Sequence, residues 1–107
     1  MKLPFEIDLK NKVAVITGGG GILCSDFSKA IAQCGAKTAV LDLNEEAAKK
    51  VAEEINQNGG TAIGISANVL QKESLIEAKN KINNQFGQVD ILINGAGGNN
   101  PKGTTSK

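Results

Sequence analysis

The stretch KVAVITGGGGIL, from Lys12 to Leu23, decides the fold of this chain of 107 residues. Its first half is a compact apolar run, as expected of a β-strand that is buried on both faces. Four glycines follow at once, and apolar residues then recur at steps of three and four, which predicts a helix. A strand that enters a helix through several glycines is typical of a phosphate-binding turn, whereas a purely structural turn needs only one glycine.

The same alternation of short apolar runs and helical periodicity continues to residue 94. Asn44 is a credible N-cap for the second helix, and glycines follow the end of each helical stretch. The predicted strands cover residues 12–17, 37–42, 61–66 and 89–94. The predicted helices run from Leu23 to Cys34, from Glu45 to about Asn58, and from about Gln71 to Phe86.

Apolar residues that share one face of a predicted helix are expected to point into the core. On the first helix this face comprises Leu23, Phe27, Ala30, Ile31 and Cys34. On the third helix it comprises Leu75, Ala78, Ile82 and Phe86.

Three strand–helix repeats and a fourth strand predict an α/β fold with a doubly wound parallel sheet of the Rossmann type, in the strand order 3-2-1-4. Residues 1–10 are expected to form an N-terminal arm, residues 11–94 a dinucleotide-binding segment, and residues 95–107 a flexible loop or tail. The fourth strand is as apolar as a central strand but has no partner after it, so we expect the sheet to be incomplete and the sequence to be cut.

Composition argues against several classes of function. The chain has no His, only two Cys and a net charge of +1. Neither a zinc site nor a Ser-His-Asp or Cys-His catalytic site is expected from these residues. All 12 basic residues are Lys, so the Arg side chains that read nucleic acid are absent. No apolar run is long enough to span a membrane, and acids near the N-terminus argue against a signal peptide, so a cytoplasmic protein is expected.

The glycine turn is expected to hold a pyrophosphate. In a doubly wound sheet the ligand lies beyond the carboxyl ends of the strands, where the strand order reverses. Free N–H groups at the start of a helix suit phosphate oxygens. A P-loop is excluded because no Gly-Lys-Ser/Thr follows. The candidate residues in this turn are Gly18, Gly20, Gly21, Ile22 and Leu23.

Asp42, at the end of the second predicted strand, is a candidate for binding the adenosine ribose. A carboxylate can accept hydrogen bonds from both ribose hydroxyls, and it repels a 2′-phosphate. Since no Arg is available to offset that repulsion, NAD is favoured over NADP. The alternative is that Asp42 only helps to start the following helix.

Two further strand ends carry weaker candidates. Asn68 could hydrogen-bond the adenine edge while Val69 packs on its face, although Asn is also a common turn residue. Asn94, Ala96 and Gly97 could border the second ribose, with an ordinary loop as the alternative.

Taken together, the turn Thr17–Ile22, the acid Asp42, the pair Asn68-Val69 and the motif 94–97 resemble those of the short-chain dehydrogenase/reductase family. The residues of these motifs are most similar to those of the family's sugar-acid branch, which is of the D-mannonate oxidoreductase or fructuronate reductase type. The resemblance implies an oxidoreductase that binds NAD(H), acts on a sugar acid or a related carbonyl or alcohol, and forms a homo-oligomer when full length.

This sequence departs from the family pattern in three respects. Ile22 and Cys24 stand where the family's turn has glycines, and Gly95 stands second in a motif that the family writes Asn-Asn-Ala-Gly. The chain also contains no Tyr, which is the family's acid/base. We therefore expect no catalytic residue among these 107 and no activity from the chain alone.

Two other functions remain open on the sequence. The missing Tyr favours a stand-alone nucleotide-binding module without turnover. An S-adenosylmethionine-binding fold also uses a glycine turn and an acid after the second strand, but the small residues after the fourth strand argue against it.

Overall fold

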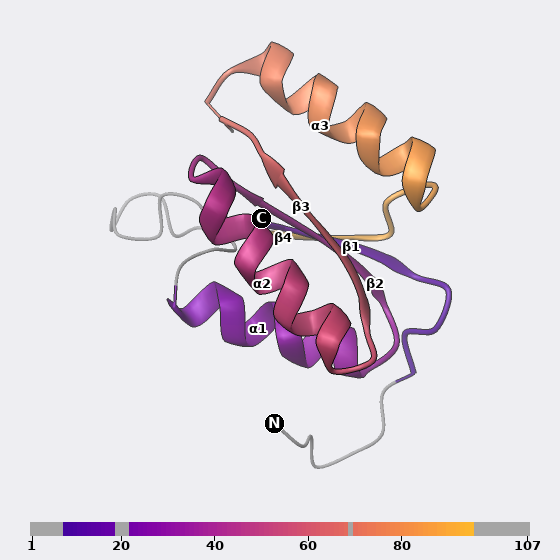
Figure 1. Cartoon of the computed structure of the whole chain (residues 1–107). Helices are drawn as coiled ribbons and strands as arrows, with labels where there is room; N and C mark the ends of the chain where they lie inside the picture. The colour runs from indigo at the N-terminus through magenta and orange to yellow at the C-terminus, as the bar shows by residue number, and fades with distance from the viewer. Residues whose placement is uncertain (1–7, 19–21, 69, 96–107) are drawn as a thin grey trace.

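A four-stranded parallel sheet with helices on both faces forms the fold (Figure 1). The computed structural model describes residues 8–18, 22–68 and 70–95. The strands are β1 (Val13–Thr17), β2 (Lys37–Asp42), β3 (Thr61–Ser66) and β4 (Ile91–Asn94). The helices are α1 (Ile22–Gln33), α2 (Glu45–Gln57) and α3 (Lys72–Gln85). The strand order β3-β2-β1-β4 confirms the predicted doubly wound topology.

The strand register brings the carboxyl ends of all four strands to one edge of the sheet. Thr17 lies opposite Leu41 on β2 and opposite Asn94 on β4. On the other side of β2, Asp42 lies opposite Ser66 of β3. Since β1 has β2 on one side and β4 on the other, the order reverses at the junction between β1 and β4.

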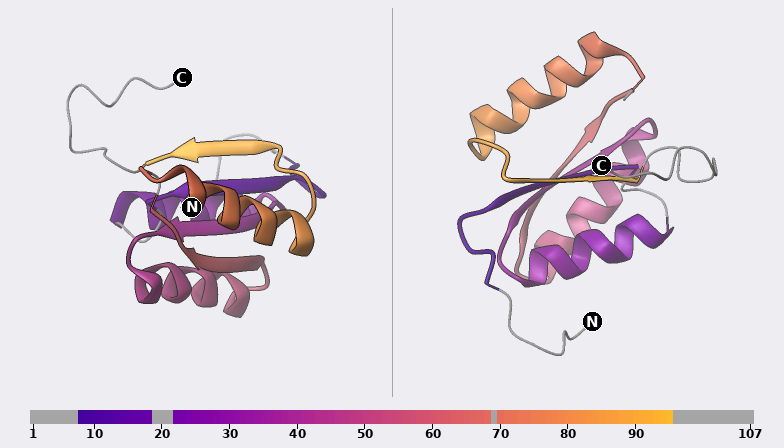
Figure 2. Two further views of the ribbon diagram at one scale, coloured as in Figure 1. Left: turned by 90° about the horizontal axis from the view of Figure 1, so that it is seen from above. Right: turned by 180° about the vertical axis from the view of Figure 1, so that it is seen from behind.

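The core has two layers, one on each face of the sheet. Helices α1 and α2 cover one face and α3 covers the other (Figure 2). Alternate residues of β1 serve the two layers, as the strand period of two requires. Val13 and Val15 pack with the α3 residues Ala78 and Ile82, whereas Ile16 belongs to the cluster on the α1 face.

The predicted helices are confirmed within a few residues, but two of the predicted core positions are wrong. Phe27 of α1 is 47% exposed, whereas its small neighbours Ser28, Ala30 and Ala32 are buried. Leu75 of α3 is 37% exposed, because the amino-terminal half of α3 stands farther from the sheet than its other half (Figure 2). Helix α1 also ends one residue before Cys34.

The outer edge of β3 is partly closed by a side chain from α2. The amide of Asn56 donates to the carbonyl of Ala62 at 3.0 Å and accepts from its N–H at 2.8 Å. An Asn side chain thereby takes the two backbone groups that a fifth strand would bind at this residue. Two residues on, a Cβ on Gly64 would lie 2.6 Å from the backbone of Ala48, so the missing side chain lets α2 pack closely on β3.

The start of α2 is as predicted, since Asn44 accepts a hydrogen bond from the N–H of Ala47 at 3.1 Å. None of the described helices is long and apolar enough to cross a membrane.

Candidate functional site

The junction between β1 and β4 is held together by Thr17. Its hydroxyl donates to Oδ1 of Asn94 at 2.8 Å. The N–H of Gly95 donates to the Thr17 carbonyl at 3.0 Å and lies 3.2 Å from the hydroxyl oxygen. Thr17 itself is only 5% exposed, and these bonds fix the ends of the two strands relative to each other.

The glycine turn begins at a position whose backbone conformation favours glycine. Gly18 has a φ of +69°, a left-handed conformation that strains a residue with a Cβ. The predicted ligands Gly20 and Gly21 lie outside the described residues. Ile22 and Leu23 form the first turn of α1, and their side chains also lie outside the description. Helix α1 begins at Ile22, four residues after Gly18 in the chain.

Asp42 ends β2, the strand beside β1, and is partly exposed. Its Oδ1 accepts a hydrogen bond from the N–H of Asn44 at 2.9 Å. This bond supports the turn into α2, so the local structural role considered from the sequence is present. The carboxylate lies at the same sheet edge as Thr17 and Asn94, as the prediction that it binds the ribose requires.

Asn68 makes the turn contacts expected of an Asn after a strand. Its Oδ1 accepts from the N–H of Leu70 at 3.0 Å, and its own N–H donates to Oγ of Ser74 at 2.9 Å. The side-chain oxygen is therefore engaged in the turn before α3. Val69, its predicted neighbour in the site, lies outside the described residues.

Asn94 ends β4 with an exposed side chain whose oxygen is bound to Thr17. The other two candidates from this strand end, Ala96 and Gly97, lie outside the described residues. The structure thus brings Gly18, Asp42, Asn68 and Asn94 to one edge of the sheet, and places Gly18 and Asn94 at the point where the strand order reverses.

The sequence reasoning did not assign a role to two residues at this junction, Thr17 and Cys24. A Cβ on Gly95 would collide with Sγ of Cys24, so the thiol occupies the space beside that glycine. Burial, and then the negative charge of Asp42, raise the pKa of the Cys24 thiol. The signal for this contact was visible as two departures from the family pattern, at positions 24 and 95, but only the fold shows that they meet.

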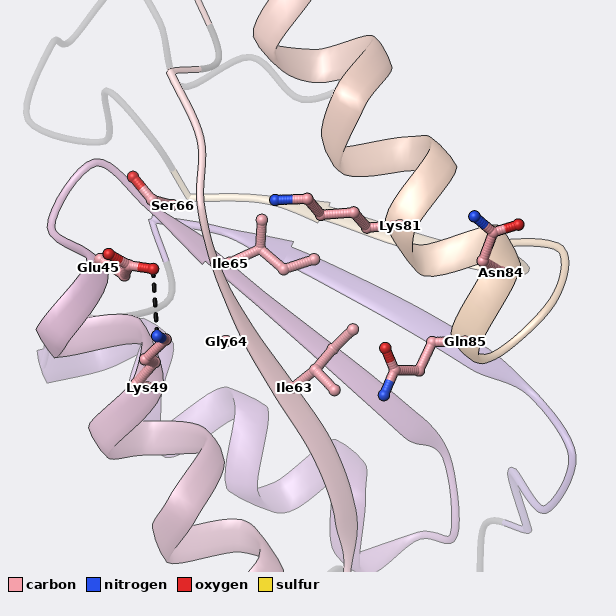
Figure 3. Close-up of a pocket in the computed structure, with 9 residues that line it drawn as sticks. All are labelled: Glu45, Lys49, Ile63, Gly64, Ile65, Ser66, Lys81, Asn84 and Gln85. Atoms are coloured by element: carbon pink, nitrogen blue, oxygen red, sulfur yellow. Dashed lines mark ion pairs between the residues drawn. The ribbon is translucent and has the colours of Figure 1, made fainter.

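A separate open pocket of about 520 Å³ lies at the outer edge of β3, between α2 and α3 (Figure 3). Its charged side chains include an ion pair of 3.2 Å between Glu45 and Lys49, and Lys81 from α3. This edge is separated from the β1–β4 junction by β2. Across the described parts of the chain, no group of three or more His, Cys, Asp or Glu side chains is arranged to hold a metal.

Relatives of this chain are oxidoreductases. An uncharacterized oxidoreductase of Haemophilus influenzae is 54% identical over 105 residues, which are 98% of this chain and 37% of that protein. An uncharacterized oxidoreductase of Bacillus subtilis is 48% identical over 103 residues, covering 96% of this chain and 37% of the relative. The 7α-hydroxysteroid dehydrogenase of Escherichia coli K12 is 36% identical over 97 residues, covering 91% of this chain and 38% of that protein. The chain therefore spans a little over a third of the length of these relatives.

Solved structures share the fold. A Haemophilus influenzae protein described as a candidate D-mannonate oxidoreductase, crystallised with NAD, is 55% identical with a TM-score of 0.85, over 94% of this chain and 36% of that one. A hydroxysteroid dehydrogenase from Escherichia coli is 33% identical with a TM-score of 0.79, over 81% of this chain and 37% of that one.

The family model for short chain dehydrogenases matches residues 12–107. That match covers the glycine turn, all four strands and the segment that follows β4. The chain belongs to the short chain dehydrogenase family.

Proposed function

We propose that this chain is the NAD-binding part of an oxidoreductase that acts on a sugar acid. The observation that carries the proposal is the arrangement at the carboxyl edge of the sheet. There Gly18 turns the chain toward α1, Thr17 ties the ends of β1 and β4 together, and Asp42 ends the neighbouring strand. Ligands of doubly wound sheets bind at such a reversal of strand order.

The pyrophosphate is assigned to the turn between β1 and α1. The positive φ of Gly18 supports this assignment, because it directs the backbone away from the strand and into the turn. Backbone N–H groups and the positive end of the dipole of α1 then favour phosphate oxygens. The proposed ligands are the main-chain groups of Gly18, Gly20, Gly21, Ile22 and Leu23.

Asp42 is assigned to the adenosine ribose. One of its oxygens accepts the N–H of Asn44 at 2.9 Å, which helps to fix the carboxylate. A carboxylate accepts several hydrogen bonds at once. Ribose hydroxyls can supply those bonds, whereas a 2′-phosphate would meet a like charge. This supports a preference for NAD over NADP.

The remaining assignments follow the strand ends. Asn68 donates from its amide nitrogen to the adenine edge, since its oxygen is engaged in the turn, and Val69 packs on the adenine ring. Asn94, with its oxygen held by Thr17, has its amide nitrogen available toward the second ribose, beside Ala96 and Gly97.

When bound, NAD supplies the hydride chemistry, and the residues of this chain bind and orient it. A sugar-acid substrate is supported by the 55% identity to the protein described as a candidate D-mannonate oxidoreductase. The chain contains no Tyr, so the acid/base group implied by the family resemblance has no counterpart among these residues. We therefore assign binding and orientation to this stretch, and no proton transfer.

The substitution Asp42→Asn tests the cofactor assignment in the complete gene product. The Asn side chain keeps an oxygen for the Asn44 N–H but loses the charge. We expect the unsubstituted protein to bind NADH more tightly than NADPH, and the variant to lose about tenfold or more of that preference, because hydrogen bonds to a charged group contribute about 1.5–3 kcal/mol. Isothermal titration calorimetry with both cofactors measures this.

Glu46→Gln is the matched control, because it removes an exposed negative charge in the first turn of α2. It is expected to leave the preference unchanged. Equal preference in the Asp42→Asn variant and the unsubstituted protein would remove Asp42 from the ribose site. Tighter binding of S-adenosylmethionine than of NADH would overturn the assignment of NAD as the cofactor.

The absence of Tyr favours a second candidate, a stand-alone nucleotide-binding module without turnover. The intact mass of the natural gene product, taken with proteases inhibited, distinguishes the two. An enzyme of the relatives' length requires a mass well above the 11.1 kDa of this chain. A mass of 11.1 kDa together with NADH binding would support the module and contradict the enzyme.

A further inference from the structure

We infer that Cys24 and Gly95 act as a matched positioning pair, which sets the distance between the start of α1 and the end of β4 at the cofactor site. The inference rests on the proposed function. The inference adds one point to that function: a single side-chain contact across the β1–β4 junction sets the geometry at the phosphate end of the site.

The contact is tight on the strand side. A Cβ at position 95 would collide with Sγ of Cys24, and it would also lie 2.9 Å from the carbonyl oxygen of Thr17. The backbone of Gly95 is tied at this place, because its N–H bonds to that same carbonyl at 3.0 Å. A side chain at position 95 therefore requires Cys24 to move and the Thr17 carbonyl to shift slightly.

The contact is also anchored on the helix side. Cys24 packs against the cluster of Ala14, Ile16 and Ala36 under α1. The hydroxyl of Ser28 donates to the carbonyl of Cys24 at 2.7 Å, one turn farther along the helix. Because Cys24 lies in the first turn of α1, its displacement moves the start of the helix with it.

The two positions complement each other in volume. The helix supplies the side chain of Cys24, and the strand supplies the space at Gly95. Interiors tolerate an exchange of atoms between two contacting residues when the total volume is conserved, and they respond to added atoms by shifting the backbone.

A shift of α1 matters for the cofactor because both partners flank its proposed site. The phosphate end depends on N–H groups at the start of α1, and the second ribose depends on Asn94, the neighbour of Gly95. Hydrogen bonds weaken steeply when their geometry is disturbed, so an extra atom in this contact is expected to lower affinity as well as stability.

Gly95→Ala, Cys24→Gly and the double variant test the pair in the complete gene product, with NADH titrations and melting temperatures for each. We expect Gly95→Ala to weaken NADH binding about tenfold or more, and the double variant to recover affinity to within about threefold of the unsubstituted protein. Cys24→Val, which adds atoms from the helix side, is expected to weaken binding while Gly95 stays intact.

Cys34→Gly is the matched control, because Cys34 lies just after the other end of α1. Combined with Gly95→Ala, it should restore no affinity. Additive effects of Cys24→Gly and Gly95→Ala, or normal NADH affinity in Gly95→Ala, would overturn the inference, and so would a loss of melting temperature without a loss of affinity. Failure of the unsubstituted protein to bind NADH would overturn the proposed function instead.

Discussion

Thr17 shows how one hydroxyl can organise a strand junction. It donates to Asn94 and lies within hydrogen-bond reach of the Gly95 N–H, and it is buried while doing so. A Val at this place would have the same shape but no polar atom. The site geometry at β1 and β4 therefore depends on a residue type that β-propensity alone would not distinguish, since Thr and Val both favour strands.

Thr17→Val is expected to lower the free energy of unfolding by about 0.5–1.5 kcal/mol, because it removes the hydrogen bond that the Thr17 hydroxyl donates to the exposed side chain of Asn94. It should also weaken NADH binding, since Asn94 loses its orientation. Thr38→Val is the control, because Thr38 is a fully buried threonine of β2 whose hydroxyl bonds to the nearby carbonyl of Ala36. NADH titrations in which both variants lose equal affinity would contradict the role of Thr17.

At the scale of elements, α2 and β3 are matched to each other by two small features. Gly64 allows the backbone of α2 to approach, and Asn56 returns from the end of α2 to bind both backbone groups of Ala62. The second feature closes part of an edge strand that would otherwise offer its N–H and C=O groups to another chain. Neither feature has a signature in hydrophobic periodicity, which explains why helical and strand patterns predicted the elements but not their contact.

Asn56→Ala is expected to lower the free energy of unfolding by about 1–3 kcal/mol, because it removes two hydrogen bonds and uncovers the edge at Ala62. Asn58→Ala provides the comparison, since the Asn58 side chain makes one exposed bond to the carbonyl of Glu54. Urea denaturation of both variants measures the difference. The edge-closing role is wrong if Asn58→Ala costs as much as Asn56→Ala.

At the scale of the whole molecule, residues are buried most completely from solvent in the middle of the sheet. All five residues of β1 are buried, and β1 has neighbours on both sides. In β4 half-buried residues alternate with exposed ones, and Leu92 is 67% exposed on the face that α3 covers elsewhere. The described structure therefore combines a well-packed centre with a strand that is supported on one side.

Native-state hydrogen exchange is expected to follow this gradient. The amides of β1 and β2 should exchange slowest, at rates set by global unfolding, and those of β4 should exchange faster through local opening. Mass spectrometry of peptides from each strand measures the order. Equal protection of β1 and β4 would show that β4 is covered by contacts that this chain's described residues do not supply.

The sequence alone determined the topology, and with it the sheet edge at which the candidate site lies, for a physical reason. Short buried strands alternate with amphipathic helices, and right-handed crossovers leave few ways to assemble them. The strand ends, and with them Gly18, Asp42 and Asn94, then meet at one edge of the sheet. The strands were found at or near their predicted bounds because each is an apolar run ended by a turn signal.

Only the tertiary structure decided what happens between elements. It exposed Phe27 and Leu75, because the distance of each helix from the sheet depends on the residues opposite and not on the helix's own period. It also paired Cys24 with Gly95, two positions far apart in the chain. Local patterns record which face of an element is apolar, whereas contacts across the sheet depend on volumes contributed by several elements together, and these become defined only when the elements pack.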